Sequence, residues 1–193
     1  MRIVLLGAPG SGKGTQGERL AERLGVPHIA SGELLRAHVA DRTDLGIEVA
    51  AGLARGDLVS DDLVLTIIGA AIIAAADAGG YILDGFPRTR AQAELAYELA
   101  LPLGIDAQAA VYLALDDDIA RQRLAGRAVG GRVDDADAEV IEHRLQVFHD
   151  NMRPILDYYD ERGILVTIDA ARPPDEVTEN ILAALKAFTS NGA

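Results

Sequence analysis

The sequence predicts an α/β fold in which a parallel sheet of about five strands is covered by helices on both faces. Short apolar runs alternate with segments of helical periodicity along the 193 residues. The apolar runs are continuous, which is typical of parallel strands buried on both sides. The first run leads through a glycine-rich loop, GAPGSGKGT, directly into a helix. A chain of this length is expected to form one well-packed domain.

The elements follow in order from these patterns. Strands are expected in residues 2–7, 26–30, 81–84, 108–116 and 164–169, and helices in residues 13–25, 32–40, 44–56, 63–78 and 173–188. A further helix is expected after the segment GRVDD. Gly25 is expected to end the first helix, and Ser31 and Ser60 are expected to cap the helices that follow them.

Composition excludes several classes of protein. The formal net charge of −12 argues against nucleic-acid binding, which requires an excess of basic residues. The apolar stretch 63–76 is shorter than the ~20 residues that span a bilayer, and no cleavage site follows the first strand. The absence of cysteine excludes disulfides and thiolate zinc sites. We therefore expect a cytoplasmic monomer that contacts no membrane and binds no zinc.

The loop from Gly7 to Lys13 matches the pattern G-x-x-x-x-G-K between a strand and a helix, which is the setting of a phosphate loop in P-loop NTPases. Its backbone N–H groups would surround phosphates at a helix N-terminus. Lys13 would reach the β- and γ-phosphates. The residue after the lysine is Gly14, and the expected hydroxyl comes one position later, at Thr15.

Asp84 ends a buried strand, where a carboxylate can hold Mg²⁺ through its waters beside bound phosphates. A turn or helix-capping aspartate remains the alternative. Arg88 follows in LDGFPRT, near the carboxyl end of the sheet, where ligands of open α/β folds bind. The planar guanidinium suits bidentate phosphate recognition.

A second group of basic residues consists of Arg123, Arg127, Arg132 and Arg144. Such a group could neutralise the charge that phosphoryl transfer spreads over the equatorial oxygens. The alternative is that these arginines pair on the surface with acids such as Asp117, Asp118 and Glu142.

These motifs together resemble the adenylate kinases of the nucleoside monophosphate kinase family, from Met1 to about Lys186. The resemblance rests on GAPGSGKGT, SGELLR, LDGFPRT followed by Gln92, GRVDD and RPILDYYDERG. It implies reversible, direct in-line transfer of the γ-phosphoryl group of Mg·ATP to AMP, giving two ADP, for adenine nucleotide homeostasis.

The resemblance also implies roles for individual residues. The implied catalytic residues are Lys13, Arg88, Arg123, Arg132 and Arg144. The implied ATP-binding residues are Gly10, Ser11, Gly12, Lys13, Gly14, Thr15, Arg123, Arg127 and Arg172. The implied AMP-binding residues are Ser31, Arg36, Asp57, Val59, Gly85, Arg88, Gln92, Arg132 and Arg144. Asp84 would hold Mg²⁺ through water, and Asp134 and Asp135 would orient the arginines of the lid.

The implied organisation is one domain, residues 1–193, with a core of residues 1–30, 58–127 and 138–190. Residues 31–57 would form the helical segment that binds the monophosphate, and residues 128–137 a short lid. Only AVGG separates Arg127 from Arg132, so the chain resembles the short form of the family, in which a loop replaces a zinc-binding lid domain. We expect this loop and the helices of residues 31–57 to close over the nucleotides.

Two positions depart from the family pattern: Glu33 replaces an aspartate, and Ala170 replaces a glycine near the backbone expected to contact the ATP base. AMP is the favoured acceptor because the amide of Gln92 can pair with the N1 and N6 groups of adenine. A UMP/CMP kinase is the nearest alternative. A noncatalytic nucleotide-binding module is a second alternative, from a different class of protein.

Overall fold

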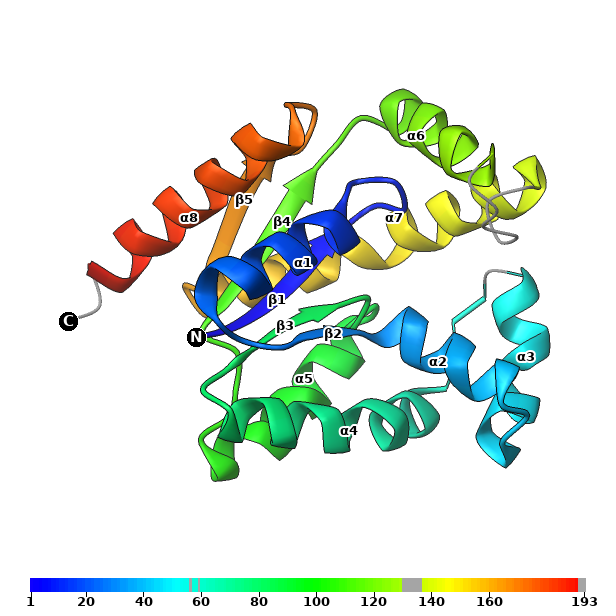
Figure 1. Ribbon diagram of the computed structural model, residues 1–193, viewed down its shortest axis with the longest axis horizontal. Coiled ribbons are helices and arrows are strands. Elements are labelled where there is room, and N and C mark those ends of the chain that lie inside the picture. Colours follow the sequence, from blue (N-terminus) through cyan, green and yellow to red (C-terminus); the bar gives the residue numbers. More distant parts are fainter. Residues whose placement is uncertain (56, 59, 130–136, 191–193) are drawn as a thin grey trace.

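A five-stranded, all-parallel sheet forms the centre of the computed structural model, which describes residues 1–55, 57, 58, 60–129 and 137–190 (Figure 1). The strands are β1 (Arg2–Gly7), β2 (His28–Ala30), β3 (Tyr81–Asp84), β4 (Ala109–Ala114) and β5 (Leu165–Asp169). Their order in the sheet is β2-β3-β1-β4-β5. The predicted α/β fold of the P-loop NTPase type is confirmed.

The helices of the described residues are α1 (Lys13–Leu24), α2 (Ser31–Ala40), α3 (Asp44–Arg55), α4 (Asp61–Asp77), α5 (Arg90–Ala100), α6 (Asp117–Val129), α7 (Ala138–Glu161) and α8 (Pro174–Ser190). The 3₁₀ turn η1 (Leu101–Leu103) follows α5. Gly25 ends α1 in the left-handed conformation, as predicted. The prediction that Ser31 caps its helix is wrong: Ala30 is the N-cap, and Ser31 is the first helical residue. Ser60 is the N-cap of α4, but its side chain makes no capping hydrogen bond.

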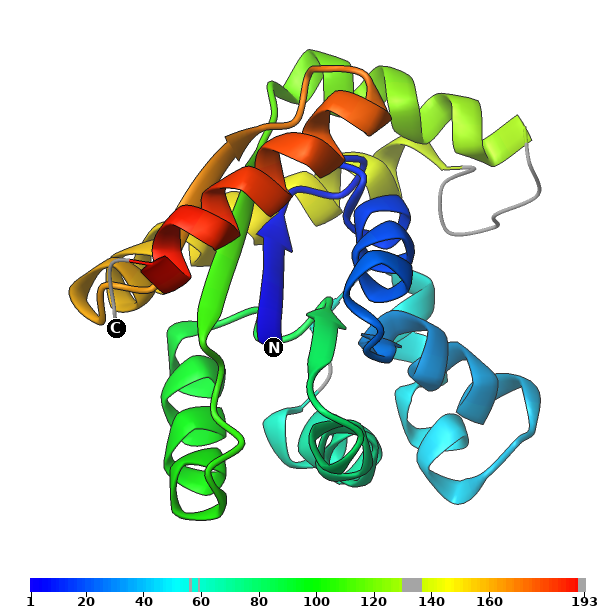
Figure 2. The same ribbon diagram turned by 60° about the vertical axis from the view of Figure 1, so that its left-hand side comes forward.

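Alternate residues of β1 enter two different cores, which explains why this strand is apolar throughout. Ile3 and Leu5 pack with residues of α1 and α8, whereas Val4 and Leu6 pack with residues of α4, α5 and α7. Figures 1 and 2 show α1 and α8 on one face of the sheet and α7 on the other. All four side chains are at most 3% exposed, and each contributes about 1.5–3 kcal/mol by burial.

The chain order of the strands places a ligand site at the carboxyl end of β1. From β1 the chain continues to β2 and β3 on one side of the sheet and then crosses to β4 and β5 on the other. Ligands of open α/β sheets bind where the strand order reverses in this way. Leu5 of β1 is in register with Asp84, so the glycine-rich loop and the segment after β3 leave the same edge of the sheet.

Helices α2 and α3 lie beyond this edge and form the helical insertion predicted for residues 31–57 (Figure 1). The assignment of a monophosphate-binding segment, a core and a lid remains a prediction. Most of the predicted lid, including Arg132, Asp134 and Asp135, lies outside the described residues, as does Val59. Among the helices that the structure describes, none combines the length and the apolar character needed to cross a membrane.

Candidate active site

A cleft of about 750 Å³ opens at the carboxyl edge of the sheet. Its described walls include six basic residues, each from a different segment of the chain: Lys13, Arg36, Arg88, Arg123, Arg144 and Arg172. The described acidic residues that line it are Glu18, Glu33, Asp57 and Asp84. One third of the chain's 18 lysines and arginines thus meet here, against four of its 30 acids. The cleft is suited to an anionic ligand although the chain carries a net negative charge.

The glycine-rich loop turns tightly from β1 into α1 at the floor of the cleft. The N–H of Ser11 donates to the carbonyl of Ala8 at 3.0 Å, and the buried Ser11 hydroxyl has no hydrogen-bond partner among the described residues. Gly10 adopts φ +83°, and a Cβ there would lie 2.8 Å from the carbonyl oxygen of Ala120. A side chain at position 10 is therefore excluded by both conformation and space.

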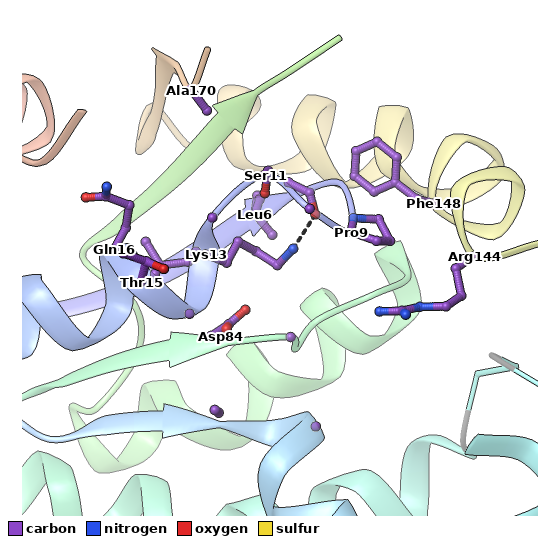
Figure 3. A pocket seen from close by; sticks show the side chains of 18 of the residues that line it. Leu6, Pro9, Ser11, Lys13, Thr15, Gln16, Asp84, Arg144, Phe148 and Ala170 are labelled. Carbon is purple, nitrogen blue, oxygen red and sulfur yellow. Dashed lines mark hydrogen bonds between the residues drawn. The ribbon is translucent and has the colours of Figure 1, made fainter. Parts of the chain in front are cut away.

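Lys13 and Asp84 both line the cleft near this loop, with the Lys13 ammonium turned toward the loop (Figure 3). The Lys13 ammonium donates to the carbonyls of Gly7 at 2.6 Å and Ala8 at 3.0 Å, so its charge lies over the loop. A Cβ built on Gly14 would lie 3.9 Å from Asp84 Oδ2. The Asp84 carboxylate is therefore beside the start of α1, where the loop amides concentrate positive potential.

On the other side of the cleft, Arg88 is held by residues close to it in sequence. Its Nε donates to the carbonyl of Gly85 at 2.8 Å, and its backbone N–H donates to Gln92 Oε1 at 2.6 Å. Thr89 caps α5 by accepting from the N–H of Gln92 at 3.1 Å. Gln92 is 2% exposed and does not line the cleft, so the structure assigns its oxygen to positioning the loop that carries Arg88.

Arg36 and Ser31 lie close to the same loop. Arg36, on α2, lines the cleft, and its guanidinium lies beside Gly32. The Ser31 hydroxyl is buried with no hydrogen-bond partner among the described residues, and a Cβ on Gly85 would lie 2.6 Å from it. The predicted AMP-binding residues Arg36, Gly85 and Arg88 thus meet at one wall of the cleft, with Ser31 directly behind.

Three further arginines approach from α6, α7 and the loop before α8. Arg123 donates through Nη2 to the carbonyl of Ala170 at 3.0 Å, which joins α6 to the segment after β5. Arg144 extends from α7 toward the cleft (Figure 3), and Arg172 pairs with Asp169 at 3.1 Å. The side chain of Arg127 lies outside the described part of the chain.

The three acids named in the surface-pairing alternative contact Arg121, an arginine that the sequence analysis did not consider. Arg121 pairs with Glu142 at 2.6 Å, with Asp118 at 3.0 Å and with Asp117 at 4.0 Å. The hydrogen bond from Arg121 lowers the pKa of Glu142. The pair with Glu142 joins α6 to α7 through Arg121. Arg123, two residues further on, instead contacts Ala170 in the cleft.

Sequence reasoning missed two polar contacts around the cleft. Gln16, buried at the start of α1, donates through Nε2 to the carbonyl of Pro174 at 2.9 Å and accepts from the hydroxyl of Thr178 at 2.7 Å. His143 of α7 donates to Asp57 Oδ1 at 2.9 Å. This hydrogen bond, followed by the one from Arg55, lowers the pKa of Asp57 from its ordinary value of 3.8. Both contacts join residues more than 80 positions apart, so no local pattern could reveal them.

Most of the predicted site residues that the structure describes lie in the cleft. The described lining includes Gly10, Ser11, Gly12, Lys13, Gly14, Thr15, Arg36, Asp57, Asp84, Gly85, Arg88, Arg123, Arg144 and Arg172. Both positions that depart from the family pattern, Glu33 and Ala170, line it too. Phe148 and Val147 of α7 also line it and were not predicted, because apolar helix residues carry no chemical signal of their own.

A glycine loop between a central strand and a helix, a carboxylate at the end of the adjacent strand and convergent arginines define a P-loop phosphotransferase. Comparison with known proteins specifies the class further. Residues 5–164 match the family model described as adenylate kinase. The chain is 44% identical over 185 residues to an adenylate kinase of Xanthomonas euvesicatoria pv. vesicatoria (strain 85-10), covering 96% of this chain and 99% of that one. It is also 44% identical over 187 residues to an adenylate kinase of Stenotrophomonas maltophilia (strain R551-3), covering 96% and 100%.

The chain belongs to the adenylate kinase family. It is a phosphotransferase that catalyses the reversible reaction of ATP and AMP to give two ADP. The reaction predicted from the sequence is confirmed.

Proposed function

We propose that the cleft holds ATP and AMP together and that the phosphoryl group passes directly between them. The observation that carries this proposal is the convergence of six basic side chains from six segments around one phosphate loop. Positioning and charge neutralisation supply most of the catalysis of phosphoryl transfer, and little covalent chemistry is required of the protein.

ATP is assigned to the side of the cleft formed by the glycine loop, α6 and the loop before α8. The amides of residues 10–15 and the ammonium of Lys13 would bind its phosphates. Arg123 and Arg172 would contact the remainder of the nucleotide, because both lie near Ala170 at the end of β5. Arg127, whose side chain is not described, is proposed for the same side.

AMP is assigned to the wall formed by α2 and the segment after β3. Arg36 and Arg88 would bind its phosphate, because both residues line the cleft and their guanidinium groups lie beside Gly32 and Gly85. Ser31, Asp57, Val59 and Gln92 are proposed to surround the ribose and base.

The residues near the loop fit Mg²⁺, which binds carboxylate, hydroxyl and water oxygens. Asp84 places a carboxylate beside Gly14, and Thr15 adds a hydroxyl to the lining. Asp84 would hold the ion through water, and Thr15 would contact it beside the phosphates. When bound with ATP, Mg²⁺ neutralises phosphate charge and orients the β- and γ-phosphates.

During transfer, the basic residues of this chain would stabilise charge on the equatorial oxygens. Lys13 lies on the donor side, Arg88 on the acceptor side, and Arg123 and Arg144 enter from the two helices beside the predicted lid. Arg132, Asp134 and Asp135 are proposed to complete this arrangement when the lid and the helices of residues 31–57 close. Closure would exclude the water that otherwise competes with AMP.

The experiment is a phosphoryl-transfer assay with Mg·ATP and AMP, dAMP, CMP, UMP or GMP offered separately. Strong turnover with AMP supports the proposed acceptor site. Turnover favouring CMP or UMP would keep the mechanism and replace the acceptor with that of a UMP/CMP kinase. A folded protein that binds ATP and transfers to none of them would refute the proposal in favour of a noncatalytic nucleotide-binding module.

A monomeric state and a cytoplasmic location remain predictions of this proposal. Sedimentation velocity across a hundredfold range of protein concentration tests the first, and a single species near 20.4 kDa is expected. Hydrogen exchange with and without a bisubstrate ligand tests closure: protection should rise in residues 31–57 and in the loop after α6. Equal exchange in both states would contradict closure.

A further inference from the structure

A second cavity, of about 320 Å³, lies on the face of the sheet covered by α4, α5 and α7. Its apolar walls come from α4 and α5, its floor from β1 and β3, and the segment after η1 completes it. Among the described residues it shares only Pro87 with the nucleotide cleft. This volume is at the lower end of the range of about 300–1,000 Å³ for small-molecule sites.

Tyr158 of α7 and Arg162, the C-cap of that helix, bring polar atoms to this largely apolar cavity. The Tyr158 hydroxyl is buried and the residue is 8% exposed; burial raises its pKa, and the neighbouring Arg162 guanidinium, which interacts with the hydroxyl, opposes that rise. The Arg162 guanidinium carbon lies 3.4 Å from the ring centre of Tyr97 and 5.5 Å from that of Tyr158. None of the ion pairs of the described residues involves Arg162. Arg162 is half-buried, and its guanidinium has more donors than these contacts use, as the Tyr158 O–H is also a donor.

These groups define the chemistry of an occupant. A tyrosine hydroxyl and a guanidinium both donate, so a ligand must supply a hydrogen-bond acceptor, and a carboxylate matches the guanidinium best. The tyrosine rings and the flat guanidinium favour a planar aromatic body over a flexible chain. Asp106 is the one carboxylate among the described lining residues, and it leaves the cavity without a large net charge of either sign.

We propose that this cavity is a binding site for a small aromatic carboxylate. The aromatic body fills the space between α4 and α5, and the carboxylate accepts hydrogen bonds from Tyr158 and Arg162. The exposed rim residues Ile73, Leu99 and Leu103, which are 49%, 55% and 61% exposed, would partly cover the bound molecule.

Gly69 of α4 offers a direct way to close the site. It lines the cavity, and a Cβ there meets no atom within 4 Å, so Gly69→Leu places a side chain in open space. The same change replaces a helix-interior glycine and raises helix propensity. Ala74→Leu is the matched control, because Ala74 is an exposed residue of the same helix that does not line the cavity.

The test is isothermal titration of the full chain with naphthalene-2-carboxylate. Wild type and Ala74→Leu are expected to bind with similar Kd, and Gly69→Leu is expected to bind at least tenfold more weakly with its phosphoryl-transfer activity retained. Arg162→Gln, and the neutral probe naphthalene-2-carboxamide on wild type, should each weaken binding about tenfold, the effect of losing one charge-assisted hydrogen bond.

Three results would overturn the proposal. The first is no binding to wild type at millimolar probe, and the second is equal binding to wild type and Gly69→Leu. The third is self-association of the chain through the leucine rim, detected by sedimentation velocity as a dimer that the probe does not dissociate. Equal affinity for the carboxylate and the carboxamide would overturn the assignment of a charged ligand.

Discussion

Thr178→Val tests the buried contact that joins the phosphate-loop helix to α8. Thr178 is 4% exposed and Gln16 is 3% exposed, and the hydroxyl donates to Gln16 Oε1 at 2.7 Å. Valine has nearly the same shape, so the change removes the hydroxyl and leaves the packing in place. Gln16 keeps its hydrogen bond to Pro174, but its buried oxygen loses the donor that Thr178 supplied.

The magnitude follows from that unsatisfied oxygen. A buried polar group that loses its partner costs about 1–3 kcal/mol. In a domain of this size each kcal/mol lowers Tm by about 2–4 °C, so we expect a decrease of roughly 2–12 °C. Function should change on the donor side, because Gln16 and Pro174 both line the cleft there. We expect KM for ATP to rise and KM for AMP to stay near that of wild type.

The assays are urea unfolding, thermal unfolding and steady-state kinetics, with Thr167→Val as control because Thr167 is exposed on β5. The control should lie within about 0.5 kcal/mol of wild type. Gln16→Leu and the double variant complete a cycle. The double variant should lose less than the sum of the single losses, since both remove the same bond. Additive losses, or a Thr178→Val protein as stable as wild type, would refute the reasoning.

Three more predictions concern the cleft and the packing of α2 against α3. Arg88→Lys keeps the charge and loses the two-pronged guanidinium, so kcat/KM for AMP should fall at least tenfold with Tm unchanged, and unaltered kinetics would remove Arg88 from the acceptor site. Asp57→Asn should reduce the loss of unfolding free energy that wild type shows in acid. Because the pKa of Asp57 is lowered in the folded state, its carboxylate stabilises the protein fully above about pH 4, and this stabilisation is lost as the pH falls further. Urea unfolding at a series of pH values from 6 to 3 measures the difference between the two proteins. Gly46→Ala should lower the free energy of unfolding by at least about 2 kcal/mol, because a Cβ at this position of α3 would overlap the carbonyl of His38 on α2. Ala51→Gly, at an exposed site of α3, is the control and should lose no more than about 1 kcal/mol. Thermal unfolding compares the two variants.

Local patterns predicted those parts of the fold that depend on local physics. Continuous apolar runs identified the five strands, and the loop motif placed the cleft at the end of β1. The pattern did not reveal α5, whose start depends on Thr89 acting as its cap and on the contact between Gln92 and the backbone of Arg88. Ser31 has the residue type of a cap, yet its hydroxyl is buried against Gly85 and α2 starts at Ser31 itself. Residue type suggests a cap, but the packing around the residue decides whether it becomes one.

The site was predictable as a set of residues and not as a set of contacts. The arginines of α6 illustrate the difference, because spacing alone could not say which of them pairs with acids and which enters the cleft. The rotation of α6 against α7 turns Arg121 toward Glu142 and Arg123 toward Ala170. The contact of Gln16 with Thr178 similarly depends on how α1 and α8 pack on one face of the sheet. Side-chain identity is written in the sequence, but these partners are set by tertiary packing.

The charge distribution explains why single arginines in this cleft should matter so much. A chain with net charge −12 repels nucleotide phosphates over most of its surface. Six basic residues from separate segments reverse the sign locally, against four acids in the same lining. Because each comes from a different segment, the full positive potential exists only when the phosphate loop, α2, α6 and α7 are all in place. Nucleotide affinity should therefore fall when any one of these segments is displaced. A lysine in place of a cleft arginine should keep the positive potential and mainly change the geometry of the phosphate contact.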